Sequence, residues 1–96
     1  MVRCIAIDDE PLALRQIKSY IERNDQLELV ALCRSAIQAR DILAKESVDL
    51  IFVDINMPDM TGLEFVRSLK NNHYIIFTTA HPEYALDGFK LNAIDY

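Results

Sequence analysis

Four acidic side chains in this sequence stand directly after short apolar runs. Asp8, Asp9 and Glu10 follow the run at residues 4–7, and Asp54 follows the run at residues 50–53. Carboxylates that lie close together repel one another, which raises a pKa or requires a cation between them. These are hard oxygen ligands with no His or Cys beside them, so they indicate Mg²⁺ or Mn²⁺ rather than zinc. Such an ion keeps part of its water shell, which leaves room for a phosphoryl oxygen.

The apolar runs must be the strands that position these carboxylates. They lie at residues 4–7, 27–33, 50–53 and 74–77 and are nearly continuous, which is typical of strands covered on both faces. The stretches between them have helical spacing. We expect helices that begin at Pro11, after Ser35 as N-cap, from about residue 62 to residue 70, and at Pro82. The first buries Leu14, Ile17 and Ile21, the third buries Leu63, Val66 and Leu69, and the fourth contains Gly88.

Strands that alternate with helices predict an α/β fold with a doubly wound parallel sheet. We expect the flavodoxin-like strand order 2-1-3-4-5, in which strands 1 and 3 are neighbours at the switch point. Residues 93–96 look like the start of the fifth strand. We therefore expect one domain over residues 1–96, truncated in its fifth strand and without its last helix. In this fold Asp8, Asp9 and Asp54 converge at the carboxyl ends of strands 1 and 3.

Each acidic feature also has an ordinary explanation when it is taken alone. Asp8 and Asp9 could cap a helix and interact with its dipole, and Asp54 could be a turn residue before a loop that contains proline. Their positions at the two strands that flank the switch point favour a cation site over these explanations.

Length and composition exclude several classes of protein. The chain has 96 residues, of which 51% are hydrophobic, and this is enough for one globular core. The net charge of −5 argues against direct nucleic-acid contact, because binding to phosphates needs a basic surface. The longest apolar run, residues 29–33, is far too short to span a membrane. We expect a cytoplasmic protein in which Cys4 and Cys33 are buried, free thiols.

The loop after Asp54 carries a more specific signature. It reads Asp-Ile-Asn-Met-Pro-Asp-Met-Thr-Gly over residues 54–62, and the fourth strand ends in Thr78-Thr79-Ala80. Together with the acidic pair after the first strand, and with Tyr96 in the fifth, this pattern resembles the receiver (CheY-like) domains of two-component response regulators. The resemblance covers the whole chain, and its motifs are spread over four strand ends.

The resemblance implies a phosphoacceptor rather than an enzyme, with some intrinsic autodephosphorylation. Asp54 would take a phosphoryl group from the phosphohistidine of a sensor histidine kinase. Asp9 would ligate Mg²⁺ directly and Asp8 largely through water. Asp54 would supply a further oxygen, and Asn56 a backbone carbonyl.

Two further residues would respond to phosphorylation. Thr79 would donate its hydroxyl to a phosphoryl oxygen, and Tyr96 would turn inward as a switch aromatic. A strand-end threonine with high β propensity and a half-buried strand aromatic are the ordinary alternatives. His81, beside the site, would be a solvent-exposed loop histidine or would influence hydrolysis, and His73 has no expected role. The family's lysine beyond the switch aromatic is not in this chain, which puts stable activation of the 96 residues in doubt.

The segment from His81 to Tyr96 is similar to receivers that precede LytTR-type DNA-binding domains. It implies that the parent protein regulates transcription through a C-terminal output domain. A sheet without its last helix exposes apolar surface, so we expect self-association as a homodimer, exchange of segments with a neighbouring copy, or poor stability.

Other functions fit the sequence less well. A Mg²⁺-dependent aspartyl-nucleophile phosphatase would need an acid where Asn56 stands. A flavodoxin-like cofactor binder would need a Ser/Thr/Gly-rich loop where the chain has Asp8-Asp9-Glu10-Pro11. An inert, receiver-derived interaction module is the remaining alternative, and the set of Asp8, Asp9, Asp54 and Thr79 argues against it.

Overall fold

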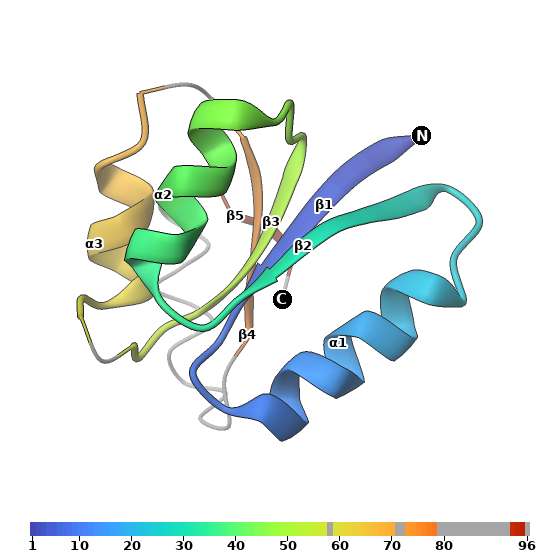
Figure 1. Ribbon diagram of the computed structural model, residues 1–96, viewed down its shortest axis with the longest axis horizontal. Helices are drawn as coiled ribbons and strands as arrows, with labels where there is room; N and C mark the ends of the chain where they lie inside the picture. Colours follow the sequence, from blue (N-terminus) through green and yellow to red (C-terminus); the bar gives the residue numbers. More distant parts are fainter. Residues whose placement is uncertain (58, 71–72, 79–92, 96) are drawn as a thin grey trace.

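The computed structural model describes residues 1–57, 59–70, 73–78 and 93–95, and its centre is a parallel five-stranded sheet (Figure 1). The strand order is β2-β1-β3-β4-β5, as the sequence predicts. The strands are β1 (Val2–Ile7), β2 (Leu27–Cys33), β3 (Leu50–Asp54), β4 (Tyr74–Thr78) and β5 (Ala93–Asp95). All neighbours pair in parallel, so the carboxyl ends of β1 and β3 lie side by side at one edge of the sheet.

Helices cover both faces of this sheet. Helix α1 (Pro11–Glu22) lies on one face, and α2 (Ala36–Lys45) and α3 (Gly62–Arg67) lie together on the other (Figure 1). Pro11 occupies the first turn of α1, where its missing N–H costs nothing. Ser35 caps α2 by accepting the Gln38 N–H, as predicted. The predicted fourth helix from Pro82 lies outside the described residues.

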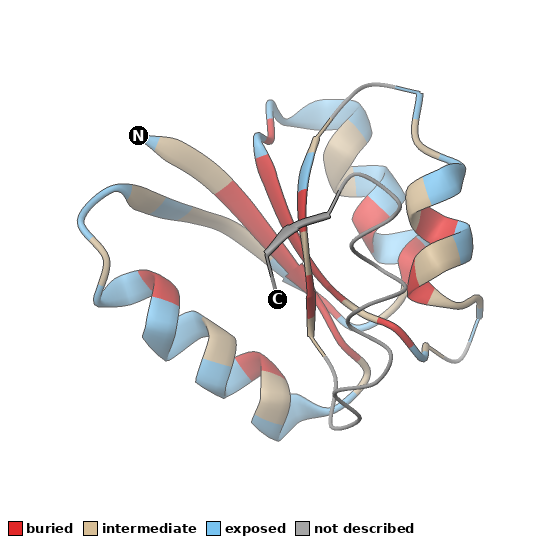
Figure 2. Cartoon of the chain, turned by 180° about the vertical axis from the view of Figure 1, so that it is seen from behind, coloured by how far each residue is buried: buried red, intermediate tan, exposed pale blue. Residues whose placement is uncertain are grey.

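Two apolar layers hold these helices on the sheet (Figure 2). On the α2–α3 side, Ala36, Ala39 and Phe65 pack against alternate residues of β1, β3 and β4. On the α1 side, Leu14 and Ile21 pack against the other set of strand residues, with Ile17 partly buried beside them. The strands β1 and β3 are therefore buried on both faces, which is why their sequences are continuously apolar.

Three expectations about these elements need correction. Helix α3 ends at Arg67 and not at residue 70, because the Ser68 Oγ hydrogen donates to the Phe65 carbonyl, 2.7 Å away, and its backbone N–H closes the last turn. Phe65 is the fully buried large residue of α3, while the three residues expected to be buried, Leu63, Val66 and Leu69, are only partly buried. Strand β2 is not covered on both faces, because it is an edge strand and Leu32 is 38% exposed.

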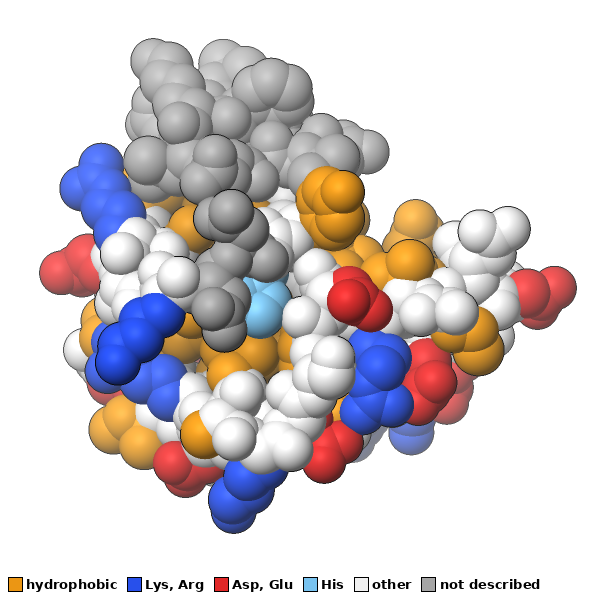
Figure 3. All heavy atoms as spheres, turned by 90° about the horizontal axis from the view of Figure 1, so that it is seen from above, with side chains coloured by type: hydrophobic (Ala, Val, Ile, Leu, Met, Phe, Trp, Pro, Cys, Tyr) orange, Lys and Arg blue, Asp and Glu red, His pale blue; other side chains and the backbone are white. Residues whose placement is uncertain are grey.

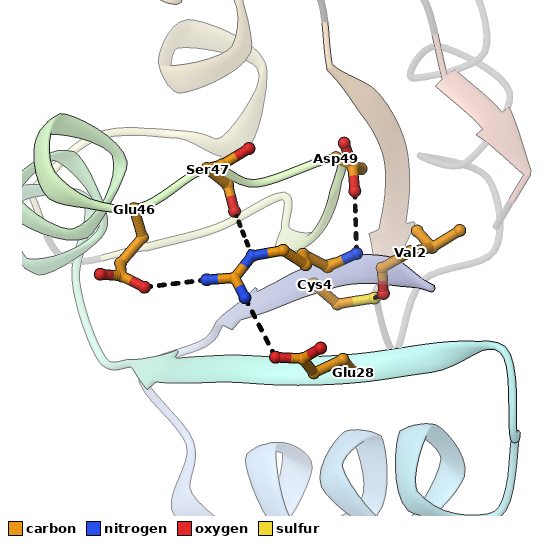
Figure 4. Close-up of polar contacts among 7 residues, drawn as sticks. Val2, Cys4, Glu28, Glu46, Ser47 and Asp49 are labelled. Atoms are coloured by element: carbon orange, nitrogen blue, oxygen red, sulfur yellow. Dashed lines mark hydrogen bonds and ion pairs between the residues drawn. The ribbon is translucent and has the colours of Figure 1, made fainter.

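The amino ends of the strands carry a separate polar network around Arg3 (Figure 4). The guanidinium donates to Glu28 at 3.0 Å, to Glu46 at 2.8 Å and to the Ser47 carbonyl at 2.7 Å. Its backbone N–H donates to the Asp49 carboxylate at 3.0 Å. Figure 3 views the molecule from this end and shows basic and acidic side chains interspersed over the described residues. The network joins β1, β2 and the α2–β3 loop far from the acidic residues at the opposite end of the sheet.

Cys4 and Cys33 are buried free thiols, as expected. Burial raises the pKa of both, that of Cys33 to about 11, so neither is a thiolate at neutral pH. In the described part of the chain, no helix is both long and apolar enough to cross a membrane.

Candidate functional site

The site is a cluster of three carboxylates at the carboxyl ends of β1 and β3. Asp8 and Asp9 follow the last residue of β1, and Asp54 is the last residue of β3. One carboxylate oxygen from each lies within 4.8 Å of the others. The structure therefore brings together the three side chains for which the sequence predicts convergence. The physical reason is the parallel pairing of β1 with β3, which places Ile7 opposite Val53.

Asp8 is the only buried charged residue among those that the structure describes, and it is 5% exposed. Its Oδ1 accepts the Glu10 N–H at 2.9 Å, which shapes the turn into α1. Burial, with a smaller contribution from the Asp9 charge, raises the pKa of Asp8. The N-cap of α1 is Glu10, whose side chain makes no capping bond. Asp8 and Asp9 are therefore not the helix caps that one explanation of the sequence would make them.

The pKa of Asp54 is strongly raised. Burial and, after it, the Asp8 charge raise the pKa of Asp54 to about 6, although the backbone N–H of Asn56 partly offsets them. A partly buried carboxylate beside two like charges is unstable as an anion unless a positive charge neutralises it. The cluster offers three hard oxygen donors for such a charge, and this donor set fits Mg²⁺ or Mn²⁺.

The raised pKa values predict that the metal-free protein becomes less stable as pH rises through the cluster's titration. Between the ordinary pKa of 3.8 and about 6, the folded state binds more protons at Asp54 than the unfolded state does. The free energy of unfolding should therefore fall by about 1 kcal/mol between about pH 5 and about pH 7, after allowance for partial solvent exposure. Urea denaturation in a chelator at both pH values measures this slope. The Asp54→Asn variant should flatten it, and an equal slope in that variant would contradict the assignment.

The loop after Asp54 is built as a tight, capped turn. Residues Asn56 and Thr61 form an antiparallel bridge across it, and the Gly62 N–H donates to the Ile55 carbonyl. Thr61 and Glu64 form a reciprocal capping box at the start of α3. Asn56 is exposed, and its backbone N–H acts to lower the pKa of Asp54.

Gly62 has a steric reason to be glycine. A Cβ at this position would lie 2.2 Å from the Asp54 carbonyl oxygen and 3.0 Å from the Ile55 Cα. The start of α3 thus packs directly on the backbone of the residue that carries the central carboxylate. In the sequence, Gly62 is visible only as the last letter of the loop signature, and its contact with Asp54 is decided by the fold.

Several predicted residues lie outside the described part of the chain. These are Thr79, His81 and Tyr96. Thr78, which precedes Thr79, is in register with Asp54, and its Oγ1 is buried without a hydrogen-bond partner in the structure. His73 lies at the other end of the sheet, where its Nδ1 is 3.0 Å from the Val48 carbonyl oxygen.

Comparison with known proteins places this geometry in a family. The family model described as the response regulator receiver domain matches residues 4–96. The transcriptional regulatory protein BtsR of Salmonella typhi is 39% identical to the chain over 98 residues, and the sensory transduction protein LytR of Staphylococcus saprophyticus is 34% identical over 98 residues. These alignments cover 100% and 99% of this chain but only 41% and 39% of those relatives.

A solved structure agrees with the sequence matches. The response regulatory domain of protein mrkE from Klebsiella pneumoniae superposes with a TM-score of 0.86 at 31% identity, over 99% of this chain and 80% of that one. The names of these three proteins describe response regulation, sensory transduction and transcriptional regulation, none of which is classical enzymatic catalysis. The chain belongs to the response regulator receiver domain family of two-component signalling.

Proposed function

We propose that residues 1–96 form the phosphoacceptor domain of a response regulator, with Asp54 as the residue that is phosphorylated. The observation that carries the proposal is the convergence of Asp8, Asp9 and Asp54 within 4.8 Å at the switch point of the sheet. Asp54 stands at the strand end, and its pKa is the highest that is resolved in the cluster, at about 6. It is therefore the carboxylate whose charge most needs to be neutralised in the metal-free protein.

The proposed reaction is transfer of a phosphoryl group from a phosphohistidine of a sensor histidine kinase. A carboxylate oxygen of Asp54 attacks the phosphorus in line, and the phosphorus–nitrogen bond breaks. The electron pair of that bond stays on the imidazole nitrogen, which takes up a proton as it leaves. The product is an acyl phosphate on Asp54, and later attack by water on the phosphorus would return the carboxylate and inorganic phosphate.

The residues around Asp54 would bind the cation that neutralises the negative charge present in this reaction. Asp9 would bind Mg²⁺ directly and Asp8 largely through water, while Asp54 and the Asn56 carbonyl supply further oxygens. The cation would neutralise the negative charge of both the carboxylate and the phosphoryl group. The Glu10 N–H, which Asp8 Oδ1 accepts at 2.9 Å, holds the Asp8 side chain in place for this role.

We assign two further roles on family resemblance. Thr79 would donate its hydroxyl to a phosphoryl oxygen, and Tyr96 would then turn inward, so that a local change of charge biases a two-state element.

The relatives BtsR and LytR are longer than this chain and are described as a transcriptional regulator and a sensory transduction protein. We therefore propose that the parent protein carries a C-terminal output domain, of the LytTR DNA-binding type, and that the receiver itself does not contact DNA.

The test is the intact mass of the protein after incubation with acetyl phosphate and Mg²⁺. A single phosphoryl adduct that requires Mg²⁺ would support the proposal. The same incubation with a chelator is the control for transfer without a metal. Absence of both the adduct and Mg²⁺ binding would contradict it and would favour the inert interaction module.

A further inference from the structure

The loop after Asp54 is tied to α2, a helix that carries none of the three clustered carboxylates. Asp59 accepts two backbone N–H groups at the start of α2, that of Ala36 on Oδ1 at 3.2 Å and that of Ile37 on Oδ2 at 3.1 Å. The helix has its own cap as well, because Ser35 Oγ accepts the Gln38 N–H at 3.3 Å. The free backbone N–H groups in the first turn of α2 are therefore bonded partly by the N-cap Ser35 and partly by Asp59, a side chain more than twenty residues away in sequence.

Asp59 is suited to hold this position as a charged group. Its slight burial acts to raise its pKa, but the backbone N–H groups of Ala36, Ile37, Asp59 and Met60 together outweigh this effect, and the pKa of Asp59 is lowered. Hydrogen bonds to an ionised acceptor are the stronger kind, and the positive end of a helix dipole favours them. The bond between this loop and α2 is thus present at neutral pH.

The segment between β2 and α2 also contacts the β1–α1 loop, which carries Asp9. Arg34 Nη2 donates to the Asp9 carbonyl oxygen at 3.3 Å. The Arg34 backbone N–H donates in turn to Gln38 Oε1 at 2.6 Å, which joins this residue to the first turn of α2. The segment of residues 34–37, which we call the β2–α2 corner, therefore holds the β1–α1 loop on one side and the β3–α3 loop on the other.

We infer that the β2–α2 corner is a clamp on the Mg²⁺ site, and that Asp59 is a positioning residue for cation binding. The inference rests on the proposed function. Asp9 and Asp54 repel each other in the metal-free protein, and this repulsion acts to separate the β1–α1 loop from the end of β3 and the loop that follows it. By holding both loops, the corner keeps the carboxylate oxygens of Asp9 and Asp54 near the spacing that the cation needs. Less of the backbone then has to become ordered when the cation binds. The corner supplies none of the three clustered carboxylates, and its effect is on their separation.

The test compares Mg²⁺ affinity by isothermal titration calorimetry in four proteins: wild type, Asp59→Ala, Asp59→Asn and Ser35→Ala. Loss of a group that hydrogen-bonds directly to a metal ligand weakens metal affinity or activity by 10- to 100-fold in other proteins, and Asp59 acts one step further out. We expect Asp59→Ala to weaken Mg²⁺ binding by about tenfold, the low end of that range, because Asp59 is solvent-exposed. Asp59→Asn keeps one accepting oxygen and should fall between Asp59→Ala and wild type.

The matched control is Ser35→Ala, because the Ser35 hydroxyl accepts the Gln38 N–H, whereas the corner holds the two loops through the Arg34 side chain and the Ala36 and Ile37 amides. It should lower the free energy of unfolding and weaken Mg²⁺ binding much less than Asp59→Ala does. If Asp59 only stabilised α2, the two alanine variants would weaken Mg²⁺ binding equally, and this result would overturn the inference. At saturating Mg²⁺ the rate of phosphorylation by acetyl phosphate should return to the wild-type value in Asp59→Ala.

A second readout does not depend on the metal. In the metal-free protein, hydrogen exchange at the Ala36 and Ile37 amides should be faster in Asp59→Ala than in wild type. Unchanged exchange would overturn the link itself. A wild-type protein that binds no Mg²⁺ would instead contradict the proposed function. The clamp would then have no metal site to act on, even if hydrogen exchange confirmed the bonds from Ala36 and Ile37 to Asp59.

Discussion

Replacing Asp54 with asparagine should abolish the phosphoryl adduct, with a loss of at least about a thousandfold in the rate of transfer from acetyl phosphate. The carboxylate oxygen is the proposed nucleophile, and an amide has no anionic oxygen to attack phosphorus. The amide also removes one charge from a cluster in which burial and Asp8 raise the Asp54 pKa to about 6. The same substitution should therefore stabilise the metal-free protein near neutral pH while it removes reactivity.

These two opposite effects make the substitution a sharp test. Intact mass spectrometry measures the adduct, and thermal unfolding in a chelator measures the stability. Asp41→Asn is a suitable control, because Asp41 is an exposed residue of α2 that undergoes the same chemical change away from the cluster. It should keep the wild-type adduct. An adduct that persists in Asp54→Asn would place the phosphoryl group on another residue and would remove the central assignment.

Replacing Gly62 with alanine should cost about 3 kcal/mol of the free energy of unfolding, since overpacking against a rigid neighbour commonly costs 1–3 kcal/mol or more. The new Cβ would lie 2.2 Å from the Asp54 carbonyl oxygen, well inside van der Waals contact. All three nearest atoms belong to the backbone of Asp54 and Ile55, so no side chain can move aside to relieve the contact. Either α3 moves away from β3 or the loop that carries Asn56 is displaced.

Urea denaturation followed by circular dichroism measures this loss, and the acetyl phosphate assay measures its effect on the site. Thr61→Ala provides the comparison, because it removes the N-cap of the same helix and should cost only about 1 kcal/mol. We expect Gly62→Ala to be the less stable of the two and to be phosphorylated more slowly. Equal stability of Gly62→Ala and wild type would show that α3 is not held against Asp54 as the structure has it.

The types of the described elements, the strand order and the convergence of the three carboxylates could be predicted from the sequence. The element types follow from local patterns. Continuous apolar runs indicate strands buried on both faces, and Pro11 and Ser35 mark helix starts with a direct physical reason. Once strands and helices alternate, the handedness of crossover connections leaves few topologies, and in the order 2-1-3-4-5 Asp8, Asp9 and Asp54 meet at one edge of the sheet.

The tertiary structure alone decided features that depend on contacts between residues far apart in the sequence. The hydrogen bonds from Ala36 and Ile37 to Asp59 have no local sequence signal, because the partners lie more than twenty residues apart in the chain. The steric contact between Gly62 and Asp54 also has no local sequence signal. The raised pKa of Asp54 likewise depends on burial and on the closeness of Asp8, and both are properties of the folded chain.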